Sequence, residues 1–259
     1  MTAPSRLVHV EYVMGTAVTF DVRDQLPEGQ LRQAIAAAVL RLHEVDRDFS
    51  TYREDSWVRR LQRQEVQPEA CPPDVRRVLD LCEHYRHLTQ GWFDAAYAGP
   101  GTVDPTGLVK GWATAAAVQV LQAAGLQNAC VNAGGDVLAI GLPEPGRAWS
   151  IGIVDPADAQ SVAERVVGDP GGAPLAVATS GVQQRGQHVL NPHTQQPAAA
   201  LRSATATGVD LTACDVWATA LMAAGAEGRD LERAIEAQLF GWFSIGTDGG
   251  RRASHGWSC

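Results

Sequence analysis

Two oxygen-bearing side chains stand four residues apart in an otherwise apolar stretch. Asp215 and Thr219 lie in residues 212–224, an Ala-rich and Leu-containing segment for which we predict a helix. Side chains at this spacing share one helix face. A carboxylate and a hydroxyl in apolar surroundings need partners, and Mg²⁺ prefers such hard oxygen donors. The alternative is that Asp215 is an N-terminal helix cap near the first turn, where a carboxylate is favourable without a metal, and spacing alone favours neither.

Residues 104–113, with the sequence DPTGLVKGWA, combine an acid, two glycines and a lysine where a helix is expected to begin. The N–H groups of a helix N-terminus attract anions, and glycines let the backbone approach a ligand. Lys110 is the only lysine among 21 basic residues, which indicates a position that needs a compact ammonium group. The spacing is not that of a P-loop. A helix capped by Asp104, with Lys110 in solvent, is the structural alternative.

Two further polar segments lie between expected strands. Residues 132–136 (NAGGD) predict a hairpin turn first and a close backbone approach to a ligand second. They lack the GxGxxG spacing of a dinucleotide fold. Thr179–Gly181, followed by Arg185 and His188, is compatible with a loop that faces phosphate, although a single histidine is more often structural. No GxSxG motif is present, so a hydrolase nucleophile elbow is not supported.

Hydrophobic periodicity predicts the elements that must position these residues. We expect helices over residues 31–45, 56–64, 74–89, 109–124, 212–224 and 231–237. We expect a strand hairpin over 7–22 that breaks at Met14–Gly15, and strands over 129–132, 137–140, 149–154, 175–179, 188–190, 203–208 and 240–245. Residues 91–107 are expected to form a loop, 159–174 a surface excursion, and the chain from about 247 a loose tail. The mixed order favours an α+β fold over a doubly wound sheet, in a single domain over residues 1–259.

Composition excludes several classes of protein. A net charge of −8 and an isoelectric point near 5.3 argue against nucleic acid as a partner, because phosphate binding needs a basic surface. The five cysteines are scattered without a CxxC pair, which argues against zinc and disulfide frameworks. Neither a signal peptide nor a membrane span is recognisable, so we expect a cytoplasmic protein.

Taken in order, eight blocks of the chain resemble the ApbE family of FAD:protein FMN transferases. Each block alone is weak, but their common order from about Met14 to Gly225 is specific. The blocks are Met14–Thr16, Phe49–Tyr52, Gly91–Asp94, Asp104–Gly111, Asn132–Asp136, Thr179–Gly181, His188–Pro192 and Asp215–Thr219.

The resemblance implies an α+β fold with layers of mixed sheet and packed helices, FAD as the substrate, and Mg²⁺ on its pyrophosphate. It assigns the metal to Asp215, Thr219 and a backbone carbonyl at or near Gly107. It assigns catalysis to His188 and Lys110. The implied FAD contacts are Met14, Tyr52, Trp92, Phe93, Asp94, Asp104, Lys110 and Val189.

By the same resemblance, a threonine of an acceptor flavoprotein attacks the FMN-side phosphorus of FAD, so that FMN becomes attached through a phosphoester and AMP leaves. Mg²⁺ would neutralise the charge that grows on the pyrophosphate. An FAD pyrophosphatase that passes FMN to water would use the same residues. A non-catalytic FAD-binding protein is the third possibility.

The chain also departs from the family pattern. The stretch between Asp94 and Asp104 is much shorter than in typical members, which alters the expected wall around the cofactor. Asn191 stands where an Asp is usual, and Ala218 stands where some members carry a second acid, so we expect weaker metal binding. The lipoprotein signal of many members is missing, which places the expected acceptor in or facing the cytoplasm.

Overall fold

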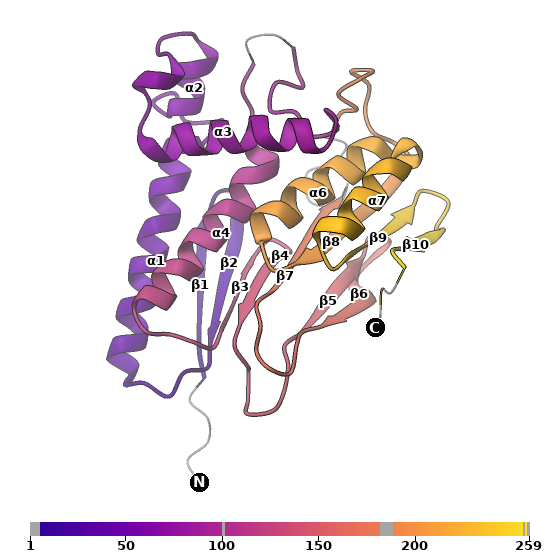
Figure 1. Ribbon diagram of the computed structural model, residues 1–259. Helices are drawn as coiled ribbons and strands as arrows, with labels where there is room; N and C mark the ends of the chain where they lie inside the picture. Colours follow the sequence, from indigo (N-terminus) through magenta and orange to yellow (C-terminus); the bar gives the residue numbers. More distant parts are fainter. Residues whose placement is uncertain (1–5, 100–101, 182–188, 256, 258–259) are drawn as a thin grey trace.

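The computed structural model describes residues 6–99, 102–181, 189–255 and 257. Its centre is an eight-stranded sheet with the order β1-β2-β3-β4-β7-β8-β9-β10, in which neighbouring strands run antiparallel (Figure 1). The strands are β1 (Leu7–Val13), β2 (Thr16–Val22), β3 (Ala129–Ala133), β4 (Asp136–Ile140), β7 (Leu175–Gly181), β8 (Leu201–Gly208), β9 (Gly241–Gly246) and β10 (Arg251–Ala253). The mixed order of strands and helices confirms the α+β prediction.

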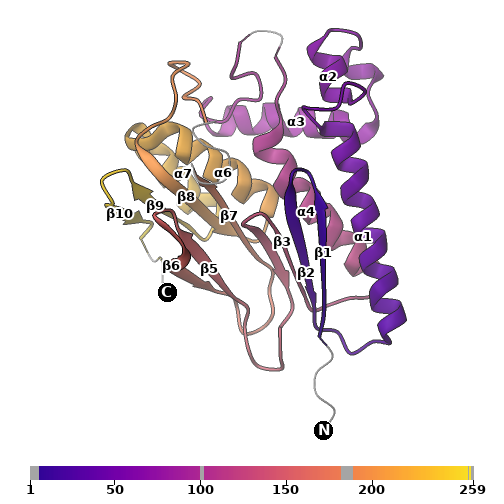
Figure 2. The ribbon, with the colours of Figure 1, turned by 180° about the vertical axis from the view of Figure 1, so that it is seen from behind.

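Helices cover one face of this sheet, as Figures 1 and 2 show from opposite sides. The helices of the described residues are α1 (Glu28–Phe49), α2 (Trp57–Gln62), α3 (Pro73–Leu88), α4 (Thr106–Ala123), α6 (Leu211–Ala224) and α7 (Arg229–Gln238), with 3₁₀ turns at Pro68–Ala70 and Gly225–Glu227. Helix α4 packs between α1 and α6, and α6 packs on β7 and β8. In both views α2 and α3 lie at one end of the sheet.

A two-stranded sheet of β5 (Ser150–Asp155) and β6 (Asp158–Val167) covers part of the opposite face. The side chains of β4 point alternately to the two faces of the large sheet, so this strand contacts both the helices and the layer of β5 and β6. Leu138 and Ile140 join the core beneath the helices, whereas Val137 and Ala139 join a second cluster with Trp149. Because successive strand residues point to opposite faces, a strand covered on both sides is apolar throughout, as β4 is after its first residue.

Helix α6 is buried along almost its whole length, which agrees with its apolar sequence. Its N-terminus is capped by Asp210, whose Oδ1 atom accepts hydrogen bonds from the Thr212 and Ala213 amides at 2.8 and 3.3 Å. Asp215 is therefore not the cap of this helix. It is the fifth helical residue, and it is 4 % exposed.

Most expected elements are present, with boundaries moved by a few residues. The segment 159–174, predicted as a surface excursion, instead contributes most of β6. The tail predicted to be loose from about 247 contains β10, which pairs with β9, and a buried Ser254. The strand expected over 188–190 is absent from its described part, where Leu190 makes only an isolated bridge to Pro197. No helix within the described ranges is long and apolar enough to cross a bilayer.

Candidate functional site

The centre of the candidate site is the contact between α4 and α6. The Gly111 amide donates a hydrogen bond of 2.8 Å to Asp215 Oδ2. A methyl group added at Gly111 would lie 2.7 Å from the Leu211 carbonyl oxygen and 2.8 Å from Asp215 Cβ, closer than real Cβ atoms come. Glycine at this position thus allows α4 to approach α6 until its backbone holds the buried carboxylate.

One turn away, the same two helices bring Gly107 to Thr219. A Cβ atom at Gly107 would lie 3.1 Å from Thr219 Cγ2 and 3.3 Å from Thr219 Oγ1. The Thr219 hydroxyl is 3.1 Å from the Ser180 hydroxyl at the end of β7. The three residues expected to bind the metal, Gly107, Asp215 and Thr219, therefore lie along one helix–helix contact.

The oxygen atoms gathered at this contact fit a hard cation. Mg²⁺ prefers hard oxygen ligands, and the Asp215 carboxylate and the Thr219 hydroxyl are of this kind. The Ser180 and Thr219 hydroxyls lie 3.1 Å apart, at hydrogen-bond distance from each other. The described part of the chain holds no cluster of three His, Cys, Asp or Glu side chains suited to a metal. A cation here would therefore depend on hydroxyl, carbonyl, water and substrate oxygens around Asp215.

Lys110 forms an ion pair with an acid that the sequence analysis gave no role. Its Nζ atom lies 2.9 Å from Asp136 Oδ2, and the two side chains are 20 % and 1 % exposed. Asp136 Oδ1 also accepts a hydrogen bond of 3.2 Å from the Thr179 amide. The solvated position considered as an alternative for Lys110 is thus wrong.

Asp104 lies just before α4. Its Oδ1 atom accepts a 3.0 Å hydrogen bond from the Thr106 amide, and its Oδ2 atom accepts one of 3.0 Å from the Tyr97 hydroxyl. Burial, together with the neighbouring Asp104 carboxylate, raises the pKa of Tyr97 to about 12. Tyr97 consequently remains a hydrogen-bond donor to Asp104 at neutral pH, and this bond fixes the loop that leads into α4.

The Trp92–Asp94 segment lies beside the start of α4. Phe93 is 3 % exposed, and its Cε2 atom would be 3.3 Å from a Cβ atom at Gly107. The Trp92 ring meets the His193 ring edge to face at 4.4 Å between centroids. Asp94 Oδ1 accepts a hydrogen bond from the Ala96 amide at 2.8 Å. Phe93 therefore supports the site from the core, whereas Asp94 is half-buried.

The remaining predicted residues are more scattered. Met14, with φ of 54°, forms the β1–β2 turn, and Tyr52, which is 90 % exposed, follows α1. The Val189 carbonyl accepts a hydrogen bond from the Ala198 amide. Among the described residues, no hydrogen bond or ring contact joins these three side chains to Asp215, Thr219 or Ser180. His188 lies outside the described residues.

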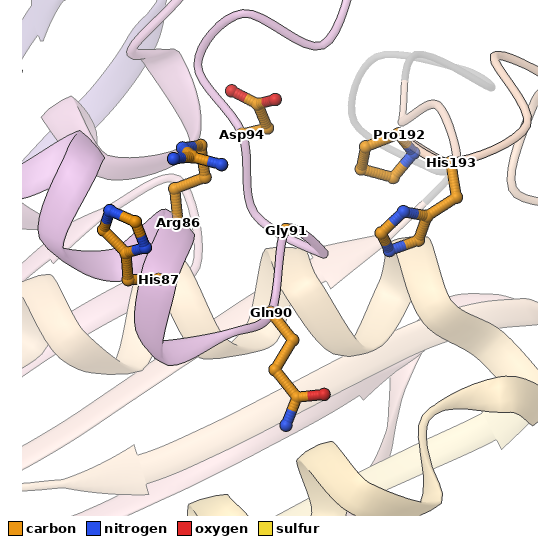
Figure 3. A pocket seen from close by; sticks show the side chains of 7 residues that line it. All are labelled: Arg86, His87, Gln90, Gly91, Asp94, Pro192 and His193. Atoms are coloured by element: carbon orange, nitrogen blue, oxygen red, sulfur yellow. The ribbon is translucent and has the colours of Figure 1, made fainter.

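A polar surface pocket of about 280 Å³ lies between the end of α3 and the loop that follows Val189 (Figure 3). Its lining residues are Arg86, His87, Gln90, Gly91, Asp94, Pro192 and His193. Of the predicted FAD contacts, Asp94 is part of this lining. A Cβ atom at Gly91, where φ is 83°, would lie 3.3 Å from His193 Cε1, so glycine permits the two walls to meet.

Three residues of the site received no separate role from the sequence. Gly111 and Ser180 stood inside recognised motifs, but spacing does not reveal which atoms meet across helices. Asp136 followed two glycines, and the hairpin predicted there is present, with φ of 58° at Gly134 and 99° at Gly135. The available signal was a charged residue at the start of an apolar strand.

Comparison with known proteins agrees with this fold and motif order. Residues 14–102 and 97–239 match the ApbE family. An FAD:protein FMN transferase of Vibrio cholerae serotype O1 is 31 % identical over an alignment of 176 residues, and the alignment covers 63 % of this chain and 51 % of that protein. The chain thus spans about half the length of this curated relative.

Solved structures share the fold across almost the whole chain. An ApbE protein from Thermotoga maritima has a TM-score of 0.83 at 21 % identity, with 97 % of each chain covered. The flavin transferase ApbE from Vibrio cholerae has a TM-score of 0.79 at 24 % identity, again with 97 % of each chain covered. The flavinyl transferase ApbE of Pseudomonas stutzeri has a TM-score of 0.79 at 22 % identity and covers 97 % of this chain and 95 % of its own. The fold and the family match together confirm the resemblance carried by the motifs, and this chain belongs to the ApbE family.

Proposed function

We propose that this protein is a Mg²⁺-dependent FAD:protein FMN transferase. It would join FMN through a phosphoester to a threonine of an acceptor flavoprotein and release AMP. The observation that carries the proposal is the buried Asp215 carboxylate, held by the Gly111 amide one helical turn from the Gly107–Thr219 contact. The named Vibrio cholerae relative supports the reaction class.

The residues present fit a magnesium ion because they offer oxygen atoms of the kind it prefers. Asp215, the Thr219 hydroxyl and the Gly107 carbonyl would hold it, with the Ser180 hydroxyl next to Thr219. When bound, the ion supplies positive charge to the FAD pyrophosphate.

The chain itself supplies further positive potential at the same place. Helix α4, which has 18 residues, begins at Thr106 beside the residues that we propose to bind the metal. Its dipole favours a pyrophosphate over a neutral ligand, with the Thr106 amide bonded to Asp104 and the Lys110 ammonium paired with Asp136. Lys110 would stabilise the charge that develops on the phosphoryl oxygens during transfer.

The transfer balances as a displacement at phosphorus. The bond between the acceptor threonine oxygen and the FMN phosphorus forms, while the bond from that phosphorus to the AMP oxygen breaks. The threonine proton passes to a base, for which His188 remains a prediction. AMP leaves with the electron pair of the broken bond. An acceptor flavoprotein with a Thr-containing flavinylation motif is the expected partner.

The test is incubation with FAD, Mg²⁺ and a threonine-containing acceptor domain, followed by flavin fluorescence of the acceptor on a denaturing gel. We expect a fluorescent band that EDTA abolishes. Asp215→Asn should lower the rate by at least about a hundredfold, because the neutral amide still accepts from Gly111 but binds Mg²⁺ poorly.

Asp24→Asn is the matched control. Asp24 is also a buried carboxylate, 7 % exposed, and it accepts hydrogen bonds from the Gln127 and Asn128 amides. The Asp24→Asn variant should leave flavin labelling of the acceptor unchanged. Free FMN and AMP without acceptor labelling would replace the proposal with an FAD pyrophosphatase, and intact bound FAD would replace it with a carrier.

A further inference from the structure

Asp136 is a buried acid at the junction of three elements. It opens β4, pairs with Ala133 across the hairpin turn, and is 1 % exposed. Its two carboxylate oxygens serve different partners, since Oδ1 accepts from the Thr179 amide of β7 and Oδ2 contacts the Lys110 ammonium of α4. A charge this deeply buried is costly unless it is paired and hydrogen-bonded.

The hydrogen bond from the Thr179 amide alone would not require the negative charge. The Thr179 amide needs an acceptor, and a neutral asparagine oxygen at position 136 would satisfy it. The charge is needed by Lys110, whose long and flexible stem otherwise allows many rotamers. At 2.9 Å from Oδ2, the ammonium is instead fixed at one point beside the helix turn that carries Gly111.

We propose that Asp136 is a positioning residue, which holds the Lys110 ammonium where the transferred phosphoryl group develops charge. This inference rests on the proposed transferase function. The chain of contacts runs from Asp136 to Lys110, and the next residue, Gly111, donates to Asp215. Asp136 acts through Lys110 and touches neither FAD nor the metal in this assignment.

The composition of the chain allows the Lys110–Asp136 ion pair to be probed directly. Lys110 is the only lysine, so an amine-directed acylating reagent labels one side chain and the chain's N-terminal amine, which peptide mass spectrometry separates. Labelling of the native protein should be slow because Nζ is held against the carboxylate and the side chain is 20 % exposed. In Asp136→Asn we expect the labelling rate of Lys110 to rise at least about fivefold, since the ion pair is lost.

The same variant is then assayed with FAD, Mg²⁺ and the acceptor. We expect the turnover number to fall about tenfold to a hundredfold, as for residues that orient a reacting group, with little change in the KM for FAD. Asp24→Asn, the matched buried acid, should change neither Lys110 labelling nor turnover. Thermal unfolding of both variants shows whether each remains folded.

The outcomes separate this inference from the proposed function. No transfer by the unsubstituted protein would refute the function, whereas Lys110 labelling still reports on the ion pair. An active parent with unchanged turnover and labelling in Asp136→Asn would overturn the positioning role. If Asp136→Asn does not fold, Lys110→Met combined with Asp136→Asn removes both charges. Recovery of folding in the double variant would show that the unpaired Lys110 charge caused the loss, and would support the Lys110–Asp136 ion pair. Continued unfolding would show that the fold needs Asp136 independently of Lys110, and would overturn the positioning role.

Discussion

Replacing Gly111 with alanine tests the helix contact on which the candidate site depends. The added methyl group would lie 2.7 Å from the Leu211 carbonyl oxygen, about 0.7 Å inside an ordinary contact of 3.4 Å. It would also lie 2.8 Å from Asp215 Cβ and 3.1 Å from Asp215 Oδ2. Two of these three atoms belong to the helix backbone or its first side-chain carbon, so rotation of a flexible side chain cannot relieve the overlap.

The expected loss of unfolding free energy in Gly111→Ala follows from two opposing effects. Overpacking of a tight interior contact costs about 1–3 kcal/mol and can cost more when backbone atoms must move. Alanine in a helix interior is favoured over glycine by about 1 kcal/mol, which offsets part of that cost. We expect a net loss of about 2 kcal/mol of unfolding free energy, or a fall in Tm of about 4–8 °C for a chain of this size.

The assay is thermal unfolding with and without Mg²⁺ and FAD, together with the Mg²⁺ dependence of acceptor labelling. Gly111→Ala should raise the Mg²⁺ concentration needed for half-maximal labelling, because α4 and Asp215 are pushed apart. Gly29→Ala in α1 is the matched control, since its Cβ atom would meet nothing within 4 Å. Gly29→Ala should be neutral or slightly stabilising. Equal Tm and equal Mg²⁺ dependence for Gly111→Ala and the parent would refute the close helix contact.

Two further changes test how the fold supports the site. Asp210→Ala removes both cap hydrogen bonds of α6 and should cost about 0.5–2 kcal/mol by denaturant unfolding; no loss would show that the cap is dispensable. Burial raises the pKa of Asp21, but hydrogen bonds from Arg23 and a second arginine outweigh burial and hold this pKa below its ordinary value. The resulting stabilisation is present above the unfolded pKa and is lost as pH falls through the lower folded pKa, so Asp21→Asn should flatten the fall in Tm between about pH 5 and pH 2. An unchanged slope would contradict this assignment.

The sequence predicted those parts of the fold that have local periodicity. The β1–β2 hairpin and the six α-helices of the described residues each have a hydrophobic pattern that lies within one segment of the sequence. Strand β6 differs because most of its side chains are exposed, and it exists through pairing with β5. Such a strand leaves no buried alternation in the sequence. The C-terminal strand β10, three exposed residues paired with β9, was missed for the same reason.

The site shows a similar division between local and non-local information. Spacing predicted that Asp215 and Thr219 share a face of α6, and the structure has both along the contact with α4. The pairing of Lys110 with Asp136 joins residues on a helix and a strand that no local pattern connects. The hairpin predicted for residues 132–136 is present, but the prediction gave no role to Asp136 at its end.

The two helix contacts of the site constrain each other. Gly107 meets Thr219 and Gly111 meets Asp215, so an advance of four residues along α4 corresponds to a return of four along α6. This is the register of two antiparallel helices that touch along one face, with successive contacts about one turn apart. A bulky side chain at either glycine would open both contacts, because rigid helices separate as units. The glycines therefore set the distance between the oxygen donors, and Asp215 and Thr219 can act as a pair only while α4 remains this close.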